Sequence, residues 1–120
     1  MRYTCACVCV LSGLKRLTAL DLERCGSIGD GLRALSELTQ LRSLNVGWCR
    51  GITDAHLVAV APLTCLERLE LSRSLMTDAG LRRLAALVRL RQLGMAGCAI
   101  TDAAMDVVVG ASVCPSCVCV

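Results

Sequence analysis

The sequence predicts an α/β solenoid in which short parallel strands form one side and helices form the other. Three observations predict it. A leucine-rich motif recurs every 24 or 25 residues, apolar residues alternate within each motif, and apolar residues follow at steps of three. The chain is 55% hydrophobic but only 2% aromatic, and it contains no Phe. We therefore expect a folded chain with an aliphatic core.

The recurring motif is L-x-x-L-x-[LVM], and its four copies start at residues 17, 41, 66 and 90. Alternate residues of a strand lie on the same face of a sheet. The second and third apolar positions of each copy should therefore face one core. These pairs are Leu20 and Leu22, Leu44 and Val46, Leu69 and Leu71, and Leu93 and Met95.

Behind each motif lies an apolar triplet spaced for one face of a helix. The triplets are Leu32, Leu35 and Leu38; Leu57, Val60 and Leu63; Leu81, Leu84 and Leu87; and Met105, Val108 and Ala111. An aspartate precedes each one, at Asp30, Asp54, Asp78 and Asp102. Asp is a preferred N-cap, so we predict helix capping. A calcium site is the weaker alternative, because calcium needs six or more oxygens around one point.

The four copies resemble the cysteine-containing leucine-rich repeats, whose signature is L-x-x-L-x-L-x-x-C-x-x-[IL]-T-D-x-G-L. They depart from it at Ser74, which replaces the cysteine, and at Gly29, which replaces the threonine; the first copy is also one residue short before Gly31. The resemblance implies a right-handed horseshoe fragment with strands on its concave side. It also implies a protein-binding role, as in the repeat arm of F-box ubiquitin-ligase receptors and related parasite or plant proteins. The matching copies read LTALDLERCGSIGDGL, LRSLNVGWCRGITDAHL, LERLELSRSLMTDAGL and LRQLGMAGCAITDAAM.

Three segments divide the chain: a Cys/Val-rich segment at 1–10, the repeat domain at 11–113, and a Cys-rich segment at 114–120. The last segment has three interpretations. Cys114-Pro-Ser-Cys117 is typical of a metal or redox site, although one ligand pair is insufficient. Cys114, Cys117 and Cys119 also follow Leu90, Leu93 and Met95 by 24 residues, as a degenerate fifth strand would. Alternating Cys and Val is, thirdly, what a translated TG dinucleotide repeat encodes.

The internal cysteines form one column with a serine: Cys25, Cys49, Ser74 and Cys98. Stacked coils place one such residue about every 4.8 Å, which makes a ladder and not a four-ligand cage. We therefore expect reduced structural thiols and neither metal nor cofactor. The only histidine, His56, has no partners at catalytic spacing and should be exposed on a helix. We predict that the chain is not an enzyme.

Residues between the core positions of each strand should face out and bind a protein partner. Trp48 is the expected anchor, since Arg24 and Arg73 occupy the equivalent positions of the flanking coils. The competing interpretation is that Trp48 shields the turn through cation–π contacts. The outward-facing positions are Ala19, Asp21, Glu23, Arg24, Ser43, Asn45, Gly47, Trp48, Arg68, Glu70, Ser72, Arg73, Gln92, Gly94, Ala96 and Gly97. The predicted partner-binding residues among them are Asp21, Glu23, Arg24, Asn45, Trp48, Arg68, Glu70, Arg73 and Gln92.

Other partners are less favoured. The net charge is only +3, and the basic cluster Arg82, Arg83, Arg89 and Arg91 is typical of a solvated helix face, so we expect no nucleic acid. No apolar run reaches 18 residues, so we expect no membrane span. Uncapped repeat ends favour self-association. We expect a fragment in a cytoplasmic protein. The alternative is a secreted or surface structural repeat protein with disulfides.

Overall fold

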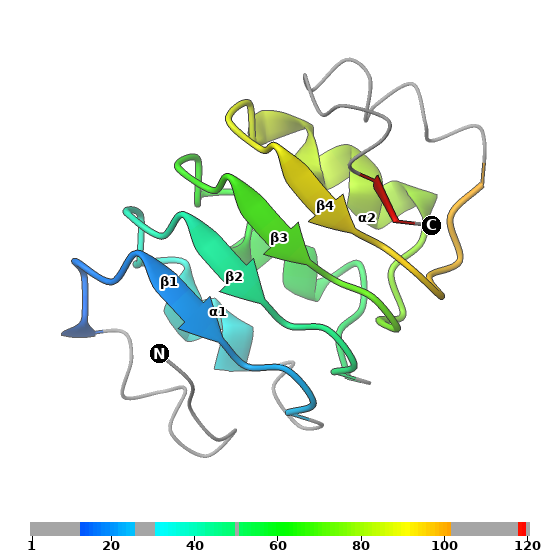
Figure 1. The fold of residues 1–120 in the computed structure, drawn as a ribbon, viewed down its shortest axis with the longest axis horizontal. Helices are drawn as coiled ribbons and strands as arrows, with labels where there is room; N and C mark the ends of the chain where they lie inside the picture. Colours follow the sequence, from blue (N-terminus) through cyan, green and yellow to red (C-terminus); the bar gives the residue numbers. More distant parts are fainter. Residues whose placement is uncertain (1–12, 26–30, 50, 102–117, 120) are drawn as a thin grey trace.

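The computed structural model describes residues 13–25, 31–49, 51–101 and 118–119. Its strands form one parallel sheet in the order β1-β2-β3-β4-β5, with the helices packed behind it (Figure 1). The predicted fold, a stack of strand–turn–helix coils, is confirmed. The strands are β1 (Ala19–Asp21), β2 (Ser43–Asn45), β3 (Arg68–Glu70), β4 (Gln92–Gly94) and β5 (Val118–Cys119).

The strands pair so that equivalent leucines lie opposite one another. Leu20 is opposite Leu44, Leu44 is opposite Leu69, and Leu69 is opposite Leu93. Backbone pairing also continues beyond the strand ends: the Trp48 N–H donates to the Ser72 carbonyl at 2.7 Å. Each coil is therefore held in register with the next coil through the turn that follows its strand.

The helical side is built from short elements. These are α1 (Leu32–Leu35), the 3-10 helix η3 (His56–Ala59), α2 (Asp78–Arg83) and the 3-10 helix η4 (Leu84–Ala86). No helix of the described residues is long and apolar enough to cross a membrane. The 3-10 form rises more per residue than the α form, so it spans the back of a 24-residue coil with few residues.

The core lies between the sheet and these helices and is aliphatic, as predicted. Burying one leucine contributes roughly 1.5–3 kcal/mol, so stacked leucine columns dominate the stability. The expected strand pairs and the first three helical triplets are all buried. The fourth triplet (Met105, Val108 and Ala111) lies outside the described residues. Ile52 and Met76 fill the turns between strand and helix.

β5 follows β4 in the sheet with a register of its own. Val118 lies opposite Leu93, and Cys119 lies opposite Gly94. The spacing expected from the sequence placed Cys117 opposite Leu93, one residue earlier.

The aspartates are not helix caps, and this prediction is wrong for the described members of the column. Neither N-cap position makes a side-chain cap bond: Thr77 is the N-cap of α2 and Ala55 that of η3. Instead, the Asp54 carboxylate accepts bonds from the backbone N–H of Thr77, at 2.7 Å, and from its hydroxyl. Asp78 accepts the same pair of bonds from Thr101 in the following coil. We call this two-bond contact between coils the aspartate clamp; Asp30 and Asp102 lie outside the described residues.

Gly80 makes room for the clamp. A Cβ atom at Gly80 would overlap Asp54 Oδ1 and would lie 2.8 Å from Leu57 Cδ1 and 2.9 Å from Met76 Cγ. Real Cβ atoms do not approach neighbours so closely. The T-D-x-G-L stretch therefore carries three functions: a threonine that donates to the preceding coil, an aspartate that accepts from the next coil, and a glycine that admits the preceding aspartate.

His56 occupies the position that corresponds to Gly80 in the preceding coil, and it bonds within that coil. Its Nδ1 accepts the backbone N–H of Thr53 at 3.0 Å and lies 3.1 Å from the Thr53 hydroxyl. A side chain reaching back to the N–H three residues earlier is half of a capping box. The prediction of a simply exposed histidine is therefore wrong, since the ring is partly buried and holds the turn.

Gly80→Ala tests the clamp. Replacing helical Gly by Ala normally stabilises a protein by about 0.5–1 kcal/mol. Here we expect destabilisation of about 1–3 kcal/mol, because the added methyl group overpacks against Asp54 and Leu57. The measurement is urea unfolding followed by circular dichroism. In an Asp54→Ala background the cost of Gly80→Ala should shrink, and equal costs in both backgrounds would rule out the proposed contact.

Stability should fall in acid partly through Asp78. Hydrogen bonds from the Thr101 hydroxyl and N–H, assisted by the charge of Arg82, lower the pKa of Asp78 below its ordinary value of 3.8. A carboxyl with a lowered folded-state pKa stabilises the fold above its unfolded pKa and loses that contribution as pH falls through the folded pKa. Asp78→Asn should therefore reduce the thermal midpoint at neutral pH and flatten its decline below pH 3.8. The measurement is the thermal midpoint as a function of pH in both proteins, and an identical pH dependence would contradict this role of Asp78.

Candidate functional site

The strand face, meaning the side of β1–β4 that points away from the helices, carries the predicted binding residues. Within each strand the middle residue is buried and its neighbours are more exposed, with the single exception of Gly94. Because alternate residues point to opposite sides, Asp21, Asn45, Glu70 and the residues before the buried leucines face outward. The predicted alternation is confirmed.

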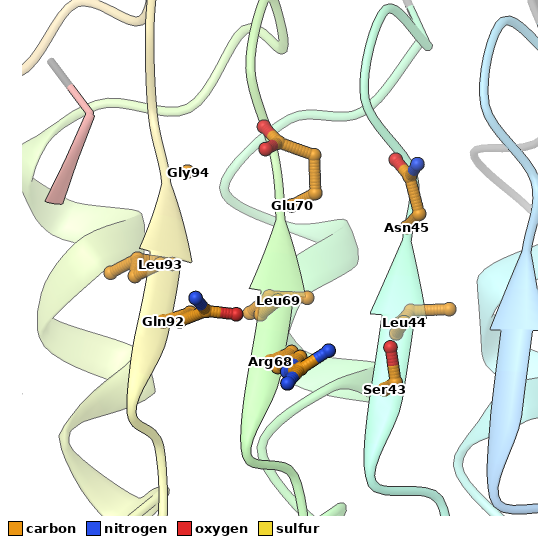
Figure 2. Close-up of a pocket in the computed structure, with 9 residues that line it drawn as sticks. All are labelled: Ser43, Leu44, Asn45, Arg68, Leu69, Glu70, Gln92, Leu93 and Gly94. Carbon is orange, nitrogen blue, oxygen red and sulfur yellow. The ribbon is translucent and has the colours of Figure 1, made fainter. Parts of the chain in front are cut away.

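A shallow depression of about 340 Å³ lies across β2, β3 and β4. Three core leucines contribute to its lining, and polar side chains stand around them (Figure 2). Four of the predicted binding residues line it: Asn45, Arg68, Glu70 and Gln92. The full lining is Ser43, Leu44, Asn45, Arg68, Leu69, Glu70, Gln92, Leu93 and Gly94.

The acceptor side chains of this face are partly committed to the backbone. Asp21 accepts from the N–H of Glu23 at 2.9 Å, and Asn45 accepts from the N–H of Gly47 at 2.9 Å. Glu70 accepts in the same way from the N–H of Ser72 at 2.8 Å. These bonds close the turn at each strand exit. They also leave each side chain less acceptor capacity for a partner.

Two positions expected to face solvent are buried because Glu70 covers them. The Glu70 carboxylate leans over Gly94 on β4, where any Cβ atom would overlap it (Figure 2). On the other side, Glu70 Cγ lies 3.1 Å from the position of a Cβ on Gly47. Gly47 and Gly94 therefore point to the strand face, as predicted, but both are buried beneath the Glu70 side chain. Gly94 has no side chain that could accept a bond from the backbone N–H of Ala96. That N–H donates to the Ser72 hydroxyl of the preceding coil.

The turn after each strand contains one residue with left-handed backbone. The φ angle is +63° at Arg24, +61° at Trp48 and +64° at Arg73, and in the fourth coil it is +74° at Gly97. This conformation costs a residue with a Cβ atom roughly 1–2 kcal/mol relative to glycine. Three of the four coils therefore hold a large side chain where glycine would fit without strain.

These three large side chains form one exposed row, the arginine–tryptophan ridge (Arg24, Trp48 and Arg73). Arg24 Cζ lies 5.9 Å and Arg73 Cζ 5.1 Å from the centroid of the Trp48 ring. The two arginines come from the coils on either side, so the indole lies between them. Trp48 is still 47% exposed, and both arginines are exposed. The predicted juxtaposition is confirmed, while its role in binding stays a prediction.

The cysteine column holds the turns together. The described cysteines Cys25, Cys49, Cys65 and Cys98 are thiols, in agreement with the expected reduced state. Cys49 Sγ donates to the Leu22 carbonyl at 3.2 Å, and Cys98 Sγ donates to the Leu71 carbonyl at 3.2 Å. Within the parts of the chain that the structure describes, no three His, Cys, Asp or Glu residues are grouped to hold a metal ion. The column is therefore a set of coil-to-coil hydrogen bonds.

The helical side has its own depression, of about 530 Å³, between α1 and η3. Arg33 and His56 provide its charged or titratable groups, and Val58, 51% exposed, is its large apolar side chain. Small residues and a proline supply the rest: Ser36, Ala55, Ala59 and Pro62. This surface is the natural control for any experiment on the strand face.

The comparisons with known proteins agree with this geometry. A family model described as leucine-rich repeat matches residues 37–61. No curated protein matches the sequence. Among solved structures, the crystal structure of an internalin from Listeria monocytogenes superposes with a TM-score of 0.54 at 18% identity. The fold is a leucine-rich-repeat solenoid. The match covers 87% of this chain and 35% of the internalin, so the chain spans about a third of that protein's length.

Several features of this face are absent from the sequence prediction. The side chain-to-backbone bonds of Asp21, Asn45 and Glu70 have a visible signal, which is an acceptor placed two residues before the turn in three of four coils. The left-handed positions have a weaker sequence signal, because only one of them, Gly97, is a glycine, the residue type that commonly adopts a positive φ angle. The cover that Glu70 places over Gly94 leaves no signal in a single coil, because the two residues belong to different coils.

The substitutions Arg24→Gly and Arg73→Gly test whether the ridge stabilises the fold or is retained for binding. Relief of the left-handed backbone should offset the lost cation–π contact and the added freedom of the unfolded chain, so the free energy of unfolding should change by less than about 1 kcal/mol. Gly97→Ala should destabilise by about 1 kcal/mol, because its φ of +74° disfavours a Cβ atom and that atom would lie 2.8 Å from Arg73 Nε. Chemical unfolding measures all three. A loss of several kcal/mol in either arginine variant would make the ridge a structural shield.

Proposed function

We propose that this chain is a protein-interaction module that binds its partner on the strand face. The observation that carries the proposal is the ridge, where three large side chains occupy left-handed positions that glycine would occupy without strain. Strain held at a surface in this way is typical of functional sites. An exposed cation–π contact contributes only about 0.5–1 kcal/mol, which does not exceed the cost of the backbone.

The depression on the strand face lies across β2 and β3, whose exits lead into the turns of Trp48 and Arg73, and it supports the same binding role. Its leucine side chains are buried, and it presents donors from Arg68 and Gln92 and acceptors from Asn45 and Glu70. Because the strands hold these side chains in fixed columns, a partner would meet a preorganised surface.

A cytoplasmic setting is part of the proposal. It is supported by the four described cysteines, which are thiols, two of them donating to backbone carbonyls of the preceding coil. An extracellular structural role would favour disulfides in a chain with so many cysteines. A place in the substrate-recognition arm of a ubiquitin ligase is one form of the proposed binding role and rests on the resemblance of the repeats alone.

Trp48→Ala should abolish partner capture by the immobilised chain, because Trp48 is the exposed centre of the ridge, and Arg68→Ala should weaken it, because Arg68 lines the depression on the strand face. Proteins retained from a cell extract would be identified by mass spectrometry and compared between variants. Val58→Ala, in the depression of the helical side, is the matched control and should retain the same proteins. Capture that survives both strand-face changes and is lost with Val58→Ala would assign binding to the opposite side.

A further inference from the structure

We propose that the arginine–tryptophan ridge recognises carboxylate groups in an acidic peptide segment of the partner. This inference rests on the proposed function and deepens it by assigning a chemistry to one part of the strand face. The ridge contributes two guanidinium groups and one indole on a single exposed row.

The guanidinium groups are the first part of the argument. Within the described residues, neither Arg24 nor Arg73 forms an ion pair, and the guanidinium of each contacts the Trp48 ring. A guanidinium that rests one face on an indole keeps the N–H donors at its edge, since stacking uses the face of the group and hydrogen bonding uses its plane. A carboxylate matches that edge with two parallel hydrogen bonds.

The indole is the second part. Arg24 and Arg73 approach from the coils on either side, with Cζ 5.9 Å and 5.1 Å from the ring centroid, while the indole stays 47% exposed. Trp48 acts as a spacer that holds the two guanidinium groups apart and limits their motion. Two restrained cations along one row fit a segment with more than one carboxylate.

The surroundings favour a peptide over a nucleic acid. Asp21, Glu23 and Glu70 lie on the strands and turns beside the ridge and carry negative charge. A continuous phosphate backbone would be repelled along this border, whereas a peptide can place single carboxylates on the ridge and neutral or basic residues over the acidic positions. Base stacking, which binds single strands, uses successive aromatic side chains, whereas the ridge has a single indole.

Trp48 is the only tryptophan of the chain, so its fluorescence reports on the ridge alone. The probe is a short, end-blocked peptide in which Glu alternates with Gly and Ser, and the reference peptide has Gln at every Glu position. We expect a saturable change of Trp48 emission with the Glu peptide and about tenfold weaker binding of the Gln peptide. Raising the salt concentration should weaken the Glu complex selectively.

The variants Arg24→Gln and Arg73→Gln should each weaken binding of the Glu peptide by about three- to fivefold, as expected for a solvent-accessible charge pair. Arg83→Gln removes the same charge from the exposed side of α2 and should have no effect. Circular dichroism of each variant would verify that its fold is intact.

Two results would overturn the inference. One is an equal response to the Glu and Gln peptides, or to the Arg24, Arg73 and Arg83 variants. The other is a single-stranded oligonucleotide that binds the ridge more tightly than the Glu peptide. If captured proteins depend on Trp48 and Arg68 but not on Arg24 and Arg73, the strand face binds and the carboxylate role fails. If they depend on Val58 alone, both proposals fail.

Discussion

Hydrogen bonds between neighbouring coils recur at three places around the circumference of the stack, and the rest of the structure depends on the register that they keep. The first place is the parallel sheet, where pairing continues through the turn to Trp48 and Arg73. The second is the cysteine column, where a thiol donates to a carbonyl of the preceding coil. The third is the aspartate clamp, which joins Asp54 to Thr77 and Asp78 to Thr101. Leucine burial supplies the energy, but these polar contacts determine how one coil sits on another.

Because the register is constant, equivalent side chains of successive coils lie in columns on the strand face. Each residue lies next to the equivalent residues of the flanking coils, so a change of residue type at one position alters the surroundings of those neighbours. Glu70 can lie over Gly94 only because the fourth coil lacks a side chain there. Trp48 can lie between two arginines only because the flanking coils offer long cations at the same left-handed position. The binding surface is thus composed along the stack and not within a single coil.

The sequence was most informative where the determinant lies within one coil. Leucine spacing predicted the strands, the core positions of the described helical triplets and the outward alternation, because burial follows local periodicity. The prediction failed where the determinant lies in the next coil. Asp54 and Asp78 have the local pattern of helix caps, yet their bonding partners are 23 residues away. The strained backbone of Arg24, Trp48 and Arg73 was also missed, because residues with large side chains rarely adopt a positive φ angle.

The bond that His56 makes to Thr53 has a consequence for how the stack comes apart. At the corresponding corner of the two following coils, the threonine N–H is used by an aspartate of the preceding coil, whereas here it is used within its own turn. In a linear array the cooperativity of unfolding is set by the contacts between neighbours. The second coil therefore keeps this turn ordered through a bond of its own. In the third and fourth coils the same turn is bonded to the coil before it, so opening of that coil should release the turn and raise amide exchange at Thr77 and Thr101.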